Sequence, residues 1–310
     1  MLIDPRHLEQ LAVIVEEGTL QLAAEKLGTS QPALSRMIAN LELRTGMTLF
    51  ERTTRPLTPT AIGLELSQQG KAIRSARLRA AEMVDFGARG FFGVLKLGAP
   101  PFLCKSLMTE AIADFLSERP NIRIDLIPDY RAGLMEKLYH NQIDVIVGPS
   151  KFAEQGNTEL TLERLFSDSN VVVGRKGHPL TAVESRTSVD LQGYTWVGHS
   201  DRSLLRSDME DALRLLGIVA PRVAFQSESA GAVLELLTVT DFLTVLPRYA
   251  LSHDGSDNLG IVPIDLPDVR HDVSAITLTQ RTETKLTSDF KAHLRAKMAA
   301  RGARSPERSR

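Results

Sequence analysis

Amide, hydroxyl and guanidinium side chains lie on one side of a segment near the start of the chain. Gln31, Ser35 and Arg36 fall on one face if the segment is helical, and Asn40 follows one turn later. Groups of these types form hydrogen bonds with base edges and with phosphates. The pattern therefore makes this face a candidate for nucleic-acid binding.

The residues around this face predict the elements that position it. The stretch 20–42 indicates two short helices joined by a tight turn. Gly28 suits the end of the first helix, Thr29 or Ser30 can cap the second, and Pro32 falls in its first turn. Apolar residues at i, i+4 and i+7 predict the inward side, namely Leu34, Ile38 and Leu41. Either a helix-turn-helix or an ordinary amphipathic hairpin gives this pattern.

The flanking segments favour the helix-turn-helix. Residues 6–17 predict a third helix, with one apolar stripe of Leu8, Leu11, Ala12 and Val15. The threonine- and proline-rich segment 47–63 fits a short β-ribbon, or wing. Arg52 and Arg55 in that segment either contact DNA phosphate or solvate a turn, and we favour the contact.

A long helix is predicted from about residue 60 to residue 89. Its apolar seam has roughly heptad spacing: Ile62, Leu66, Ile73, Ala76, Ala80, Met83 and Val84. Such a rod needs a partner along its apolar side. We expect a dimer, because no other N-terminal segment is free to cover the seam, although packing on the chain's own domain is the alternative. Glycines near residues 88–93 predict a hinge.

From Val94 onward, short apolar segments alternate with helical patterns. This alternation predicts mostly parallel α/β sheets, and a break near residues 149–161 suggests two lobes. The strands are expected at 94–98, 122–127, 143–148, 170–174, 194–198, 222–226, 242–247 and 273–278. The helices are expected at 103–117, 132–141, 203–216, 230–239 and 288–300. Residues 301–310 lack apolar side chains other than one alanine and predict a disordered tail.

Composition excludes several classes of protein. The 310 residues are 43% hydrophobic and 24% charged, which is typical of a globular chain of two or three domains. No apolar run is long enough to span a membrane, and no secretory signal is visible, so we expect a cytoplasmic protein without a membrane partner. The net charge of −1 argues against nucleic-acid binding through bulk charge. A small local DNA-binding surface remains compatible with it.

Motifs for catalysis are weak. Gly198-His199-Ser200-Asp201-Arg202 resembles a nucleophile elbow but lacks its final glycine. Ser288 and Lys291 fit a Ser-x-x-Lys pattern that has two free positions. The seven histidines show no metal-ligand spacing, and there is no phosphate-binding glycine loop. We expect no enzyme, no metal and no cofactor. An α/β hydrolase and a stand-alone solute-binding protein are the alternatives.

The order of these features resembles the LysR-type transcriptional regulators along nearly the whole chain. The N-terminal resemblance is carried by AAEKLGTSQPALSRMIANLELRTGMTLFER, residues 23–52, followed by Arg55 and Gly63. Weaker resemblances follow in the family's order: VLKLG, RPNIRIDL, QIDVIVG, RLFSDSNVVVGRKGHPL, DLQGYTWV and VLPRYAL. The chain departs from the family at Pro59-Thr60, where a leucine-threonine pair is usual, and at 239–242, where a glycine pair is common.

The resemblance implies an α+β multi-domain chain. Its parts are a winged helix-turn-helix DNA-binding domain (1–62), a long linker and dimerisation helix (63–90), a two-lobed α/β effector domain similar to periplasmic binding proteins (91–300) and a tail (301–310). Lobe I is expected at about 91–160 and 267–300, and lobe II at about 161–266. By position, Gln31, Pro32 and Ser35 would meet bases. The residues expected at phosphates are Thr29, Ser30, Arg36, Arg52, Thr53 and Arg55.

The family further implies a small effector between the lobes and a homodimer or homotetramer on double-stranded DNA, with RNA polymerase as a further partner. Ligands of open α/β sheets bind at the carboxyl ends of strands. We therefore expect an effector pocket lined by Phe102, Arg131, His199, Ser200, Arg202 and Ser227. Arginine and histidine suit a carboxylate, and Phe102 suits an apolar part of the effector. Many relatives have Ser or Thr in the first loop, whereas this chain has Ala99-Pro100-Pro101-Phe102.

Cys104 is the one cysteine of the chain, so no internal disulfide is possible. It is predicted in the first turn of a helix, where the pKa of a thiol tends to fall. A redox-sensing role and a small buried residue are the two interpretations, and we favour the second.

Overall fold

The computed structural model describes residues 3–51, 57–90, 92–153, 156–180, 191–251, 257–264, 266 and 270–304. The chain divides into two compact units. The first contains Met1–Gly90, and the second contains most of the residues that follow. Each unit is described by itself.

The first unit is helical. Its helices are α1 (Pro5–Glu17), α2 (Leu20–Leu27), α3 (Gln31–Thr45) and α4 (Ala61–Ala88). The first three each end at a glycine with positive φ, a conformation that only glycine adopts without strain: Gly18 at 66°, Gly28 at 63° and Gly46 at 69°. Polar side chains cap their starts, so the glycines and the caps together fix the boundaries of the two-helix hairpin.

The predicted three-helix core is present. Leu11 and Ile14 of α1 are fully buried, and Leu34 and Leu41 of α3 pack in the same cluster. Ile38 was expected among the inward residues but is only half-buried, because Met37 takes the more central place on α3. The small side chains of α2 allow its close contact with the other helices.

The segment after α3 has the start and end of a ribbon. Phe50 and Pro59 form an isolated antiparallel bridge, and the Glu51 amide donates to the Thr58 carbonyl oxygen at 2.8 Å. These contacts bring the two ends of the predicted wing together.

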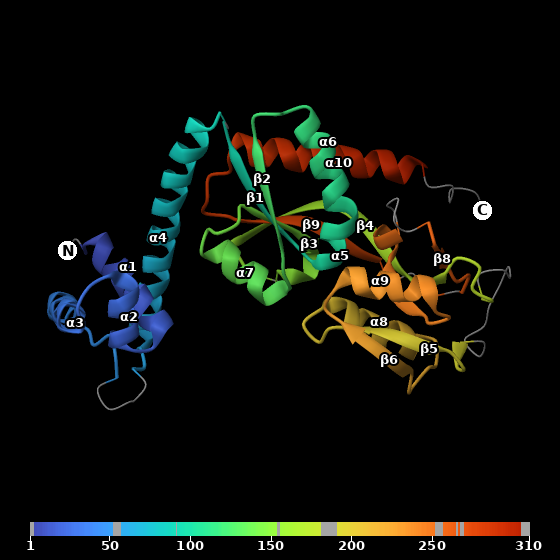
Figure 1. Ribbon diagram of the computed structural model, residues 1–310, viewed down its shortest axis with the longest axis horizontal. Coiled ribbons are helices and arrows are strands. Elements are labelled where there is room, and N and C mark those ends of the chain that lie inside the picture. Colours follow the sequence, from blue (N-terminus) through green and yellow to red (C-terminus); the bar gives the residue numbers. More distant parts are fainter. Residues whose placement is uncertain are drawn as a thin grey trace. The chain divides into compact units, whose positions relative to one another are not determined.

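Helix α4 packs along α1, and this corrects our reason for expecting a dimer along the whole helix (Figure 1). The buried residues of α4 are Gly63, Ser67 and Gly70 rather than the large apolar residues of the predicted seam. A Cβ atom at Gly70 would lie 1.9 Å from the Leu8 carbonyl oxygen, so the two helices touch through their backbones. The chain's own domain therefore covers the first part of α4.

The last turns of α4 are different. Leu78, Met83 and Val84 are 51%, 69% and 75% exposed. Within the described part of the first unit, this end of the helix keeps its apolar side chains in solvent. The helix ends at Ala88, and Gly90 has a φ of 83°, in agreement with the predicted break.

The second unit alternates strands and helices. In its first part lie β1 (Val94–Ala99), α5 (Pro101–Leu103), the π-helix η1 (Cys104–Met108), α6 (Thr109–Ser117), β2 (Arg123–Pro128), α7 (Arg131–Tyr139), β3 (Val145–Pro149) and the 3-10 helix η2 (Ser150–Phe152). Then follow β4 (Leu160–Arg175), β5 (Thr195–His199), α8 (Leu204–Leu215), β6 (Arg222–Ser227), α9 (Ala230–Val239), β7 (Thr244–Pro247), η4 (Arg248–Leu251), β8 (Leu259–Ile261), β9 (Arg270–Leu278) and α10 (Lys285–Arg304).

The sheets are mixed, whereas mostly parallel sheets were expected. One sheet has the order β2-β1-β3-β9-β4-β7, with β8 also paired to β4, and a second sheet consists of β5 and β6. The β1-β2, β1-β3 and β5-β6 pairs are parallel, but every pair that involves β4 or β9 is antiparallel. Residues 160–169 form the first half of β4, and this half was not anticipated.

Strand β4 connects the two lobes. Its residues Leu160–Ser169 pair with β9, and from Asn170 onward it pairs with β7 and β8. We call the part built on β1, β2 and β3 lobe I and the part built on β5 to β8 lobe II. Strand β4 changes its pairing partner between Ser169 and Asn170, later in the chain than the lobe boundary expected at residue 161.

Close packing orients the helices of lobe I. A Cβ atom at Gly98 would lie 2.8 Å from Leu134 Cδ2, so α7 lies tightly against β1. Phe115 of α6 and Phe290 of α10 are fully buried, with ring centroids 5.2 Å apart. Helix α10 extends four residues beyond the expected end at residue 300. In the described ranges, no helix combines the length and the apolar character needed to cross a membrane.

Candidate functional site

The amino-terminal end of α3 presents the predicted polar face. Ser30 caps the helix, because its hydroxyl accepts a hydrogen bond from the Ala33 amide at 3.4 Å. The face opposite the buried Leu34 and Leu41 is exposed. Its exposed residues include Thr29, Ser30, Gln31, Pro32, Ser35 and Arg36. Six of the nine predicted DNA-contact residues are therefore exposed at the start of α3.

The other three predicted DNA contacts, Arg52, Thr53 and Arg55, lie outside the described residues. Their flanks belong to the ribbon that is closed by Phe50 and Pro59. The placement of these three residues remains a prediction.

The second unit contains a pocket between its lobes, at the carboxyl ends of several strands. All six residues expected from the sequence line it: Phe102, Arg131, His199, Ser200, Arg202 and Ser227. They follow β1, β2, β5 and β6 or end them, as the rule for open α/β sheets requires. The cavity measures about 30 Å³, which is room for one or two water molecules. Side chains of the two lobes therefore leave little free space at these strand ends.

Pro100 and Pro101, which were expected with Phe102 to contact an apolar part of the effector, also line the pocket. The lining residues that were not predicted are Tyr130, Pro149, Phe152, Ser203, Leu204, Leu205, Asp208, Pro247, Tyr249 and His271. Prolines and aromatic rings make much of the wall apolar, while Asp208 adds a carboxylate. Tyr130 could have been predicted from the sequence, because it directly precedes Arg131 at the end of β2. Asp208 could not have been predicted in this way, because it lies inside α8 and not at the end of a strand.

The two arginines of the pocket already have partners. Arg131 donates from Nε to the Phe152 carbonyl oxygen at 2.8 Å. Arg202 lies 3.4 Å from an Asp129 carboxylate oxygen and 3.7 Å from a Glu228 carboxylate oxygen. Its side chain is 58% exposed, so these ion pairs are screened by water. Both cations are available to an anion only in competition with these contacts.

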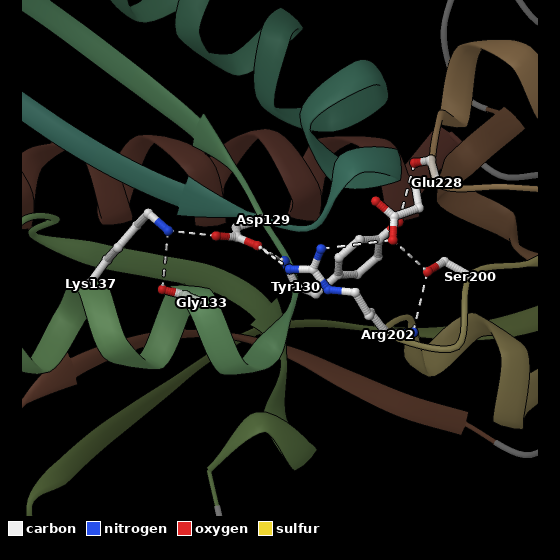
Figure 2. A network of polar contacts seen from close by, with 7 residues as sticks. All are labelled: Asp129, Tyr130, Gly133, Lys137, Ser200, Arg202 and Glu228. Carbon is white, nitrogen blue, oxygen red and sulfur yellow. Dashed lines mark hydrogen bonds and ion pairs between the residues drawn. The ribbon is translucent and has the colours of Figure 1, made fainter. Parts of the chain in front are cut away.

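A network of polar contacts joins lobe I to lobe II beside the pocket (Figure 2). Tyr130 of lobe I donates from its hydroxyl to the Glu228 carbonyl oxygen of lobe II at 3.2 Å. The Arg202 guanidinium lies 5.1 Å from the centre of the Tyr130 ring, a cation–π arrangement. Ser200 donates to the Glu228 carboxylate at 3.0 Å. We call this network of Asp129, Tyr130, Ser200, Arg202 and Glu228 the latch.

The latch has a fixed charge at Asp129. Burial opposes the ionisation of this carboxyl, but hydrogen bonds from Lys137 and from the Tyr130 amide outweigh burial, and the pKa of Asp129 is lowered. Lys137 Nζ lies 2.5 Å from the carboxylate. A second ion pair between the lobes joins Lys151 and Asp208 at 2.5 Å. Both carboxylates oppose an anion placed next to them.

His199, which was expected to help hold a carboxylate, is almost completely buried. Its side chain is 2% exposed, and burial lowers its pKa below the ordinary value. Its Nε2 atom lies 3.0 Å from the Val245 carbonyl oxygen. A neutral imidazole binds a carboxylate much more weakly than an imidazolium does, so the carboxylate role falls to the arginines.

Cys104 is buried, in agreement with the interpretation that we favoured. Burial raises the pKa of its thiol to about 12, and Sγ donates to the Ala99 carbonyl oxygen at 3.3 Å. The expectation of a lowered pKa is wrong because the residue begins a π-helix inside the core of lobe I rather than an exposed helix end. The described residues also hold no group of three or more His, Cys, Asp and Glu side chains that could bind a metal ion.

Comparison with known proteins identifies both units. The model of the bacterial regulatory helix-turn-helix protein, lysR family, matches residues 5–64, and the LysR substrate binding domain matches residues 88–299. The regulator GbpR of Rhizobium radiobacter is 30% identical over 246 residues, which cover 78% of this chain and 80% of that protein. The transcriptional activator LysR of Escherichia coli K12 is 28% identical over 299 residues, or 95% of this chain and 93% of that protein.

Solved structures share the fold. Full-length CbnR in complex with its target DNA has a TM-score of 0.63 at 19% identity, covering 95% of this chain and 99% of that chain. A full-length OxyR variant from Pseudomonas aeruginosa has a TM-score of 0.64 at 19% identity and covers 95% of both chains. At this identity the likeness concerns the fold alone.

These matches confirm the resemblance seen in the sequence and decide against the hydrolase alternative, because the proteins of this family are transcriptional regulators. The chain belongs to the LysR family of transcriptional regulators, with a DNA-binding helix-turn-helix and an effector-binding domain.

Proposed function

We propose that this cytoplasmic regulator reads double-stranded DNA with the exposed face of α3. Gln31, Pro32 and Ser35 meet base edges or thymine methyl groups in the major groove. The residues assigned to phosphates are Thr29, Ser30, Arg36, Arg52, Thr53 and Arg55. The observation that carries this assignment is the exposure of the polar face of α3 above a buried apolar side.

The effector is a small carboxylate with an apolar part. Arg131 and Arg202 hold the carboxylate, and Phe102 with the neighbouring prolines contacts the apolar part. The closed cavity is too small for such a molecule, so the lobes separate to admit it. Binding then selects a different lobe arrangement, and that change alters the DNA contacts.

The regulator acts as a homodimer or homotetramer. The exposed end of α4, with Leu78, Met83 and Val84, is the surface proposed for contact with a second copy. Two-fold symmetry predicts an imperfect palindromic site whose half-sites are about one helical turn apart, or a multiple of it. RNA polymerase is the further partner through which the bound regulator changes transcription.

A gel-shift titration of the full chain on the DNA upstream of its own gene tests this function. We expect a sequence-specific complex whose mobility or affinity changes when carboxylates and aromatic acids are added. Thermal shift of the same chain identifies which acids bind. Binding to this DNA with no preference over random sequence contradicts the DNA assignment. Acids that bind without changing the DNA complex contradict the regulatory step.

A further inference from the structure

His199 ends β5 at the wall of the pocket. The ring is almost completely buried and meets the Phe102 ring edge to face, with centroids 5.6 Å apart. Among the described residues, His271 is the other histidine that lines the cavity. The hydrogen bonds of His199 determine which ring nitrogen carries the proton.

Both neighbours of His199 Nε2 require this atom to be a donor. The Val245 carbonyl oxygen at 3.0 Å can only accept a hydrogen bond. Thr244 Oγ1 lies 3.1 Å from Nε2 and donates its own proton to the Val197 carbonyl oxygen at 2.8 Å. The threonine oxygen therefore accepts from the histidine as well. In the neutral ring, Nε2 carries the hydrogen and Nδ1 carries a lone pair.

The lone pair of His199 Nδ1 has no partner. Three buried side-chain atoms of the described residues lack a hydrogen bond, namely His199 Nδ1, Asn170 Oδ1 and His293 Nε2. Of these three residues, only His199 lines the pocket. A buried acceptor without a donor is unfavourable, so native proteins usually pair such an atom with protein, water or ligand.

We infer that His199 Nδ1 accepts a hydrogen bond from the effector, which is therefore a carboxylate that also carries a hydroxyl or N–H group. The inference rests on the proposed effector pocket and narrows its ligand class to hydroxy- or amino-substituted acids. A carboxylate oxygen facing Nδ1 would place two acceptors against each other, so the acid group points to Arg131 or Arg202 instead.

Matched pairs of acids test this class on the full chain. Calorimetric titration compares the affinity of benzoate with those of the three hydroxybenzoates and of 4-aminobenzoate. It also compares the affinity of propionate with that of lactate. We expect at least one donor-bearing acid to bind about tenfold more tightly than its unsubstituted partner, because a site built around a hydrogen bond rejects the analogue that lacks it.

Two variants assign the preference to Nδ1. In His199→Phe an aromatic ring remains but the acceptor is lost, so the two acids of a pair should bind with about equal affinity. In His199→Asn the side-chain amide reaches the position of Nδ1, and part of the preference should return. Thermal melting and DNA binding of both variants show that they are folded. The ¹⁵N shift of His199 Nδ1 in the unaltered chain should also move when the preferred acid is added, which requires no variant.

The outcomes separate the two proposals. If acids of both kinds bind equally well, or if the preference survives in His199→Phe, the inference on His199 is wrong while the carboxylate pocket stands. If no acid of the panel binds, the carboxylate pocket and the inference both fall.

Discussion

The exposed face of α3 and the pocket between the lobes are built in opposite ways. The proposed base contacts come from adjacent turns of one helix, and Gln31 and Ser35 are in solvent. The pocket gathers side chains from Pro100 to His271, and its two arginines already bind other groups of the protein. We infer that the DNA surface is ready to bind as it stands, whereas the pocket must give up internal contacts before it binds its effector.

The largest effect is expected at Arg131. Replacing it by alanine removes a half-buried cation from the pocket and should weaken the binding of a carboxylate by about 2–5 kcal/mol, or roughly thirtyfold or more. The affinity for DNA without effector should be unchanged. Calorimetric titration with the best acid and a gel shift measure the two quantities. Arg214→Ala, at a side chain 73% exposed on α8, is the matched control. Equal losses in both variants would contradict the role of Arg131.

The second effect concerns α3. Gln31→Ala should remove a hydrogen bond to a base edge and lower the discrimination at one base pair by about 1–3 kcal/mol. Affinities for the operator and for single-base variants of it measure this loss. Gln69→Ala, an exposed glutamine on α4, serves as the control. If the base preference of Gln31→Ala is unchanged, another part of α3 reads the DNA.

The contrast between the two regions also explains what the sequence could predict. The α3 face depends on neighbours in the chain, since Ser30 caps the helix and Gly28 and Gly46 end the two helices. Local spacing is sufficient for such a surface. The six pocket residues were also found, because the rule for strand ends needs only the positions of the strands.

Long-range pairs were not predictable in the same way. The Tyr130–Glu228 contact joins residues 98 positions apart, and nothing local to either residue points to the other. The packing of α4 was misjudged because heptad spacing directed attention to the large side chains. Gly63 and Gly70 make the contact instead, and glycine carries no hydrophobic signal. The lowered pKa of His199 could not be predicted, because burial cannot be read from the residue type.

The third effect concerns the latch. Tyr130→Phe removes the hydrogen bond to the Glu228 carbonyl oxygen but keeps the ring under Arg202. One such bond contributes about 0.5–1.5 kcal/mol to the closed state. Because the closed cavity excludes the effector, weakening the closed state should raise the apparent affinity by about two- to tenfold. Titration of the full chain measures this change.

Tyr194→Phe is the control for the latch, since Tyr194 packs in lobe II and is not among the residues that line the pocket. Tighter binding in Tyr130→Phe alone supports a latch that competes with the effector. Weaker binding in Tyr130→Phe would mean that the hydroxyl contacts the effector directly, and the latch would then be part of the binding site.

The smallest effect distinguishes the two units by their response to acid. Burial lowers the pKa values of His178 and His199 in the effector domain. In the unfolded chain these histidines have an ordinary pKa of about 6.5. As the pH drops through that value, the unfolded chain binds more protons at these sites than the folded chain does, so the free energy of unfolding falls. Burial also raises the pKa of Asp168 above its ordinary value of 3.8. Between pH 3.8 and the raised pKa, this shift increases the free energy of unfolding as the pH drops, which is opposite to the effect of the histidines.

In the first unit, the corresponding group is Glu16. Burial opposes its ionisation, but Arg74, Lys71 and Lys26 outweigh burial and lower its pKa from 4.5. The contribution of ionised Glu16 to the stability of the first unit is therefore lost only as the pH falls below 4.5. Between about pH 7.5 and about pH 5.5, the effector domain should therefore lose stability while α1–α4 do not. The melting temperature should drop by roughly 2–4 °C per kcal/mol lost.

Two probes follow the units separately in the full chain. The fluorescence of Trp196, which is fully buried in lobe II, reports the effector domain, and hydrogen exchange of the α1 and α3 amides reports the first unit. His199→Gln should reduce the acid sensitivity seen by Trp196, because it removes one of the two titrating groups and leaves His178. If the melting temperature reported by Trp196 is the same at both pH values, neither histidine is held neutral by the fold. The free acceptor at His199 Nδ1 would then be present only above the ordinary histidine pKa of about 6.5, because protonation removes its lone pair.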